Sequence, residues 1–155
     1  MVLKISDPTT IQSLQQSKLM DESGLPKQIK MELHNVVLVK PILSSGRNAW
    51  SAGFWLKDPA EKEAVIDIED KVREIPGVAT LRSELKMGKF IWAKCLKAGD
   101  QIKTVFRTKQ GDLKTYAELP IKEKMSVFIQ TESIWNSQAT PSDKFYRWTV
   151  TEIII

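Results

Sequence analysis

Short runs in which apolar and polar residues alternate occupy most of the chain beyond residue 77. Alternation of this kind places successive side chains on opposite faces of an extended strand, so that one face can be buried and the other solvated. The clearest runs span residues 89–96, 102–109, 125–135 and 145–154, and the last two form a predicted final hairpin. Strands at such short spacing pair antiparallel, which predicts a barrel or a two-sheet sandwich.

Two further strands are predicted before residue 58. The first is long and spans residues 29–42, with a β-bulge near Asn35, where the alternation shifts by one position. The second spans residues 49–56, and its alternation puts Trp55 on the face opposite Phe54.

A single strong helix signal separates these two strands from the later ones. Asp58 is suited to cap a helix, Pro59 to open it and Pro76-Gly77 to end it, which predicts a helix over about residues 59–75. The apolar stripe of this helix is predicted from residues at helical spacing, namely Ala64, Ile68, Val72 and Ile75. Because such a stripe must be buried, we expect the helix to cover the sheet.

Weaker patterns complete the assignment. Residues 7–20 carry a short helical pattern, residues 78–85 predict a strand, and residues 115–119 predict a short one. We interpret the 155 residues as a single domain, with residues 1–28 as an N-terminal extension and residues 29–155 as a β-rich core. The predicted fold is therefore mostly β with one amphipathic helix.

Charge is unevenly distributed along the chain, although the net charge is only +4. Between Lys86 and Lys124 there are ten basic and four acidic residues, whereas between Asp58 and Glu74 there are seven acidic and three basic ones. A basic segment beside an acidic one suits a polyanionic partner. Lysines on strand edges also protect sheets from aggregation, and the charge pattern supports both interpretations equally.

The sequence favours an intracellular protein of the cytoplasm or nucleus. No apolar run approaches the roughly 18 residues of a membrane-spanning helix, and the first residues lack the pattern of a secretory signal. The single cysteine, Cys95, excludes a disulfide within the chain, which suits a reducing compartment. We expect no membrane partner.

No enzyme signature is found in the sequence. His34 and Cys95 are the only histidine and cysteine, which are too few ligands for a structural zinc site. Glu84 and Lys86 have the E-x-K spacing of one class of metal-dependent nucleases, although surface charge is the simpler interpretation. We expect no catalytic residue, no metal site and no cofactor, and keep the nuclease as a third alternative.

Basic residues are interleaved with aromatic ones in the later strands. Phe90, Trp92 and Lys94 share one strand face, and Phe145 and Arg147 share another. An open sheet face with rings and cations suits sequence-tolerant binding of a single strand, because bases stack on the rings while cations follow the phosphates. The candidate nucleic-acid-binding residues are Trp92, Lys94, Lys103, Arg107, Lys109, Phe145 and Arg147.

The same aromatic residues also suit a hydrophobic core. One face of each strand in a β-rich domain is buried, so any one of the five tryptophans is more readily explained as a core residue. For the five tryptophans together, two interpretations are equally supported: that at least one lines a binding surface, and that none does.

Two strands before the helix and a β-rich run after it resemble oligonucleotide-binding (OB) barrels, in which three strands usually precede the helix. The Ser-Ile-Trp at 133–135 and the Arg-Trp-Thr-Val at 147–150 resemble the closing hairpin of small β-rich proteins of large DNA viruses. Some of those are thought to be single-stranded DNA-binding proteins. This resemblance covers residues 126–135 and 145–153, and it implies an OB-like barrel and an accessory role in replication or recombination.

We therefore expect a single-stranded nucleic-acid-binding protein without catalytic activity, whose partner is DNA or RNA. The resemblance adds the expectation of a viral protein acting in its host cell. The alternative is a structural or assembly protein, such as a virion or scaffold component, that associates through sheet edges. In that case the apolar end, Ile153 to Ile155, would complete a partner's sheet or a homo-oligomer.

Overall fold

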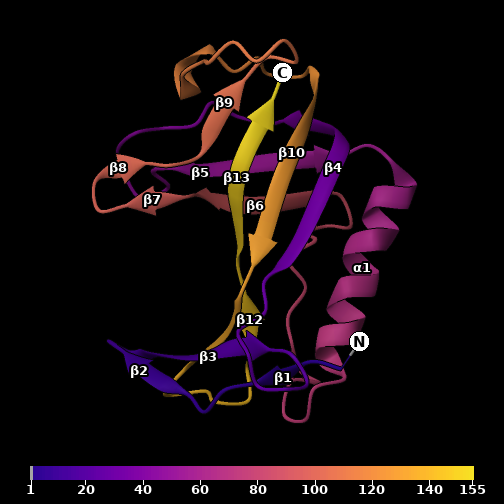
Figure 1. Cartoon of the computed structure of the whole chain (residues 1–155), viewed down its shortest axis with the longest axis vertical. Helices are drawn as coiled ribbons and strands as arrows, with labels where there is room; N and C mark the ends of the chain where they lie inside the picture. Colours follow the sequence, from indigo (N-terminus) through magenta and orange to yellow (C-terminus); the bar gives the residue numbers. More distant parts are fainter. Residues whose placement is uncertain (1) are drawn as a thin grey trace.

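The computed structural model describes residues 2–155 and consists of a β-barrel, a smaller second sheet and one long helix beside them (Figure 1). The helix is α1 (Pro59–Arg73), and a short 3-10 helix spans Tyr116–Glu118. The strands of the barrel sheet are β4 (Ile29–Leu38), β5 (Ser51–Leu56), β6 (Phe90–Cys95), β9 (Val105–Arg107), β10 (Lys124–Thr131) and β13 (Trp148–Ile154). The second sheet contains β1 (Lys4–Ile5), β2 (Thr9–Ile11), β3 (Leu14–Met20), β11 (Ser133–Ser137) and β12 (Phe145–Tyr146), and β7 (Lys97–Ala98) pairs with β8 (Gln101–Ile102).

Five strands close into the barrel in the order β4-β5-β6-β13-β10, and β10 pairs back to β4. Neighbouring strands are antiparallel except β6 and β13, which are parallel. A meander of three strands whose third strand lies parallel to the last is the strand order of OB barrels. The predicted mostly-β fold with one helix is confirmed, and of the two predicted architectures, a barrel and a two-sheet sandwich, the structure has the closed barrel. In OB barrels three strands usually precede the helix, whereas here α1 follows the second barrel strand, β5, as the sequence pattern predicted.

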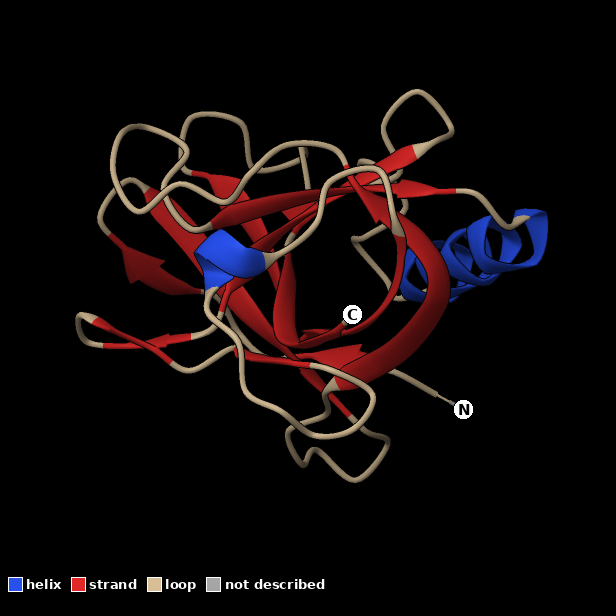
Figure 2. Cartoon of the chain, turned by 90° about the horizontal axis from the view of Figure 1, so that it is seen from above, coloured by secondary structure: helices blue, strands red, loops and turns tan. Residues whose placement is uncertain are grey.

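The barrel interior is filled by every second residue of its strands. Trp148, Phe54 and Ile91 are fully buried there. Seen from above, the strands enclose this core, α1 lies outside the barrel, and the segment with the 3-10 helix crosses the upper end (Figure 2). Leu119, which follows that helix, is buried against the core. Alternation therefore predicted correctly which faces of these strands are buried.

The second sheet is built from the N-terminal residues and the middle of the final hairpin. β3 pairs with β1, β2 and β11, and β11 pairs with β12. The helix predicted over residues 7–20 is wrong, because Ser17 and Leu19 are buried on either side of the exposed Lys18, on a strand paired to β11. A left-handed residue, Gln12 (φ 57°), makes the tight turn between β2 and β3. The predicted N-terminal extension is thus an integral part of this sheet.

The start of α1 stabilises a bulge in β4. Asp58 caps the helix as predicted, its Oδ1 accepting a hydrogen bond of 2.9 Å from the amide of Ala60. The carboxylate of Glu61 does not complete a capping box. It accepts hydrogen bonds from the backbone amides of His34 (2.5 Å) and Asn35 (2.9 Å). The register of β4 with β10 shifts at this point, which confirms the predicted bulge.

The buried stripe of α1 differs from the prediction. Val65, Glu69 and Val72 are buried, whereas Ala64 is exposed. Val72 and Ile75 are buried as predicted, and Ile68 is half-buried. The change lies at Glu69, which is buried because donors from other segments meet its carboxylate. Among the described residues, no helix has the length and apolar character that crossing a bilayer requires.

Three of the predicted strands are also corrected. Residues 78–85 form no strand, because Ser83 and Glu84 are held by the helix through Glu69 instead of by a neighbouring strand. Residues 115–119 contain the 3-10 helix, and the run 102–109 is interrupted at residues 103–104. There Thr104 turns its hydroxyl inward to the carbonyl of Val150 at 2.6 Å.

Candidate functional site

The outer face of the β5–β6 pair carries an aromatic surface. Trp55 is paired with Phe90, and one step along the strands Gly53 is paired with Trp92. The next outward position on β6 is Lys94, which registers with Thr149 of β13. Phe90, Trp92 and Lys94 therefore share one face, as predicted, and this face points away from the core.

Trp92 lies flat against the backbone of Gly53. A methyl group on Gly53 would lie 2.6 Å from Cζ3 and 2.7 Å from Cη2 of the Trp92 ring, so only glycine leaves room for the ring there. Trp92 nevertheless stays 40% exposed. One face of the indole is thus supported by the sheet while the other is open to solvent, which is the geometry of a stacking platform.

Beside Trp92, the rings of Trp55 and Phe90 meet at a centroid distance of 5.9 Å. The Nζ of Lys57 lies 3.0 Å from the centroid of the Trp55 ring, where an ammonium is attracted to the π-electrons. An open recess of about 430 Å³ adjoins these rings, and Val37, Val39 and Lys122 also line it.

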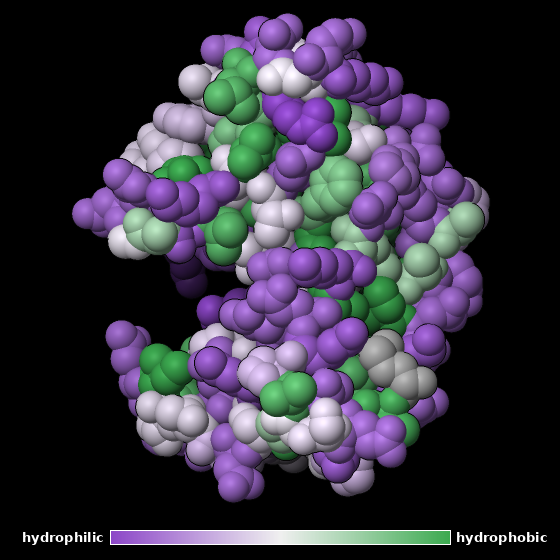
Figure 3. Space-filling view, in the orientation of Figure 1, coloured by the Kyte–Doolittle hydropathy of each residue, from purple (hydrophilic) through white to green (hydrophobic). Residues whose placement is uncertain are grey.

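Beyond Lys94 at the other end of β6, a cleft of about 250 Å³ lies between the barrel and the second sheet. The space-filling view shows the molecule hollowed between its two lobes (Figure 3). Polar and basic side chains dominate this cleft, with Glu132 as the one acid lining it. Its principal residues are Gln16, Lys94, Gln130, Trp135, Arg147 and Thr149.

Arg147 lies at the bend between β12 and β13, among aromatic rings. Its guanidinium carbon is 5.2 Å from the Trp135 ring centroid and 5.6 Å from that of Phe145. Arg82 also approaches Phe145, at 5.3 Å. Phe145 is half-buried and already contacts two guanidinium groups, so it is less open to a ligand than Trp92.

Of the seven candidate residues, Lys94 and Arg147 line the cleft. Phe145 lies beside Arg147, and Trp92 is the neighbouring outward residue to Lys94 on β6. Lys103 is exposed and does not itself line the cleft. It lies next to a residue that does, because its amide donates a 2.6 Å hydrogen bond to the carbonyl of Leu96.

Arg107 and Lys109 lie elsewhere. Arg107 registers with Ile154, seven residues from Arg147 along β13, a separation of roughly 23 Å. Its Nη2 and Nε bind one carboxylate oxygen of Glu152 at 2.7 and 3.0 Å. Lys109 lies in the exposed turn beyond β9. The alternation pattern predicted that these cations lie on an outward face, but it does not specify at which end of the barrel they lie.

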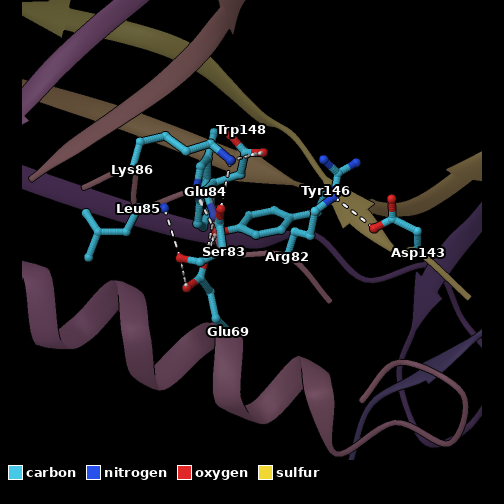
Figure 4. A network of polar contacts seen from close by, with 9 residues as sticks. All are labelled: Glu69, Arg82, Ser83, Glu84, Leu85, Lys86, Asp143, Tyr146 and Trp148. Atoms are coloured by element: carbon cyan, nitrogen blue, oxygen red, sulfur yellow. Dashed lines mark hydrogen bonds and ion pairs between the residues drawn. The ribbon is translucent and has the colours of Figure 1, made fainter. Parts of the chain in front are cut away.

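A buried polar network joins α1 to the chain beyond it (Figure 4). Glu69 is only 2% exposed, and its carboxylate accepts hydrogen bonds from the Ser83 hydroxyl (2.6 Å), the Glu84 amide (2.7 Å) and the Tyr146 hydroxyl (2.5 Å). Burial and the neighbouring Glu69 raise the pKa of the Tyr146 phenol well above its ordinary value. The network holds α1, the segment after it and the final hairpin in fixed positions.

Comparison of the chain with protein-family models, curated proteins and solved structures finds no match.

The residues of the nuclease alternative adjoin this network. Burial raises the pKa of the Glu84 carboxyl, and Lys86, whose Nζ lies 3.9 Å from Glu84, opposes that shift. Within residues 2–155, no three His, Cys, Asp or Glu side chains gather in a way that could hold a metal ion. His34 is exposed on β4, whereas Cys95 is buried.

The C-terminal strand is used within the chain itself. Ile153 is fully buried in the core, and β13 pairs with both β10 and β9 over its last residues. The amide of Ile155 donates to the carbonyl of Arg107 at 2.9 Å. This segment therefore lacks the open edge that completing a partner's sheet would need.

Sequence reasoning missed Trp55, Lys57 and Trp135 as members of this surface. For Trp55 a signal existed, because the alternation placed it opposite the buried Phe54 and therefore outside. Trp135 came to the cleft only through the pairing of β11 with β3 and β12, which no local pattern encodes.

Proposed function

We propose that this chain binds single-stranded nucleic acid, without chemical conversion, along the outer face of β5 and β6 and into the adjoining cleft. The observation that carries the proposal is the position of Trp92. Its ring rests on Gly53, keeps its other face open, and lies one outward position from Lys94. In OB barrels this pair of strands is the binding face.

The chemistry of this surface matches that of a single strand. Stacking on an aromatic ring contributes about 1–3 kcal/mol per base and tolerates any base, because each base has a π-face. Lys94 and Arg147 lie close enough to the rings to follow the phosphates. An accessory role in replication or recombination of a viral genome belongs to this proposal through the resemblance in the final hairpin.

Fluorescence titration tests the proposal. Tryptophan emission of the full chain should fall on addition of oligo-dT or oligo-rU at low salt and recover as salt is raised, since phosphate contacts release counterions. Trp92→Ala should weaken binding about tenfold, whereas Leu25→Ala, a change at an exposed residue of the turn after β3, should not. Absence of quenching and of a mobility shift at micromolar protein would refute the proposal.

Two other outcomes are informative. Magnesium-dependent degradation of the oligonucleotide that Glu84→Ala abolishes would favour the nuclease. A concentration-dependent oligomer without oligonucleotide binding would favour the assembly protein. Its contacts would have to use strand edges other than those of β13, such as the edge of β9 or the short edges of the second sheet, since β13 is already paired on both sides.

A further inference from the structure

We infer that the recess beside Trp55 holds one nucleobase of the bound strand, next to the base that stacks on Trp92. This inference rests on the proposed function and specifies how far the binding path extends. Four residues carry it: Trp55 and Phe90 as the walls, Val37 as the floor, and Lys57 as the cation above the ring.

The walls of the recess are built by cross-strand pairing. Val37 of β4 is paired with Trp55 of β5, which is paired with Phe90 of β6, and all three point outward. Lys124 of β10 precedes Val37 in the same row. The recess is thus an apolar shelf across three strands, and its volume of about 430 Å³ lies within the range of small-molecule sites.

Cations surround this apolar shelf. Lys57, Lys122 and Lys124 are all exposed at its margin. Lys122 holds a left-handed backbone conformation (φ 66°) with its amide bonded to the carbonyl of Leu38, a strained position found more often at functional sites. An apolar surface for a ring, bordered by lysines for a phosphate, is complementary to a nucleotide unit.

The spacing along β6 relates this recess to Trp92. Phe90 and Trp92 are separated by two residues, about 6.6 Å along a strand. That distance is close to the separation of neighbouring bases in an extended single strand. Consecutive bases can therefore occupy the Trp92 platform and the Trp55–Phe90 recess, while the preceding phosphates reach Lys94 and the cleft.

Lys57 covers the ring that the base would use. Its Nζ is 3.0 Å from the Trp55 centroid, so a base that stacks on this face must displace it. The displaced ammonium stays within reach of the phosphate of the same nucleotide. Lys57 then exchanges a cation–π contact for a charge-assisted contact with the strand.

Variants of the full chain test the inference. Trp55→Leu should weaken binding of long oligo-dT about tenfold, and the loss should shrink as the oligonucleotide is shortened to what Trp92 alone can hold. Lys57→Ala should lower the slope of log affinity against log salt by about 0.7, the share of one phosphate in a single strand. Lys71→Ala, at an exposed lysine of α1, serves as the matched control and should leave the slope unchanged.

The results separate this inference from the proposed function. If the unaltered chain binds oligo-dT and Trp92→Ala weakens it, while Trp55→Leu and Lys57→Ala change neither affinity nor slope, the recess is not part of the path. If the unaltered chain binds no oligonucleotide, both proposals fail. Titration with thymidine monophosphate tests whether the recess binds a free nucleotide. If the mononucleotide binds as tightly as oligo-dT, the assignment of the recess to a base of a nucleic-acid strand is overturned. Should Trp55→Leu not fold, as judged by its thermal transition, the Lys57→Ala slope decides.

Discussion

The phenol of Tyr146 donates a hydrogen bond of 2.5 Å to the carboxylate of Glu69, inside the contact between α1 and the final hairpin. The indole of Trp148 in turn donates to the Tyr146 oxygen at 3.1 Å. Arg147 lies between these two buried residues in sequence and projects to the other side of the chain, where it meets Trp135 in the cleft. The buried network thus determines where this cation of the candidate site lies.

Tyr146→Phe should destabilise the fold by about 1–3 kcal/mol, because it removes one donor to a buried carboxylate and the acceptor of a buried indole N–H. Urea denaturation would measure the loss. Tyr116→Phe, at a half-buried tyrosine whose ring packs edge-on against Trp50, is the matched control and should change stability far less. The raised pKa of Tyr146 also predicts that stability declines as pH rises above about 10, and that Tyr146→Phe reduces this decline.

Glu84→Gln should stabilise the protein at pH 7, and the gain should shrink towards pH 4. The pKa of the Glu84 carboxyl is raised above its ordinary value of 4.5, mainly by burial. At pH values between 4.5 and the raised pKa, Glu84 is protonated in the folded state but has lost its proton in the unfolded state. Stability is therefore lost as pH rises through this range. Denaturation of both forms at each pH tests this, with the exposed Glu63→Gln as control. An equal gain at both pH values would contradict the assignment.

Gly53→Ala should destabilise the chain by about 1–3 kcal/mol, since the added methyl group would overlap the Trp92 ring at 2.6 Å. The ring must tilt away, which should also change its fluorescence and weaken oligonucleotide binding. In a background that carries Trp92→Ala, the same change should cost much less. A double-mutant cycle without coupling would show that the ring does not rest on Gly53.

Arg147→Ala and Arg107→Ala should have opposite profiles. Arg147→Ala should lower the salt slope of oligonucleotide binding by about 0.7 and weaken binding at low salt. Arg107→Ala should leave binding and slope unchanged, because its guanidinium is paired with Glu152 at the far end of β13. Equal effects of the two substitutions would mean that binding follows net charge and not the cleft.

Alternation along the later strands determined much of this protein. It placed Trp92 and Lys94 together on one face of their strand, and the shift at Asn35 located the bulge, because burial of one sheet face imposes period two on the residues themselves. The capping signals at Asp58 likewise located the start of α1.

Tertiary structure decided what no local pattern carries. Residues 7–20 became strands because β11 offered β3 a partner, and Glu69 entered the buried stripe of α1 because three donors from distant segments meet its carboxylate. Closure of the barrel also placed Arg147 beside Trp135 and carried Arg107 to the opposite end. Strand pairing between residues far apart in the chain determines which outward side chains become neighbours, and the sequence of a single strand does not contain that information.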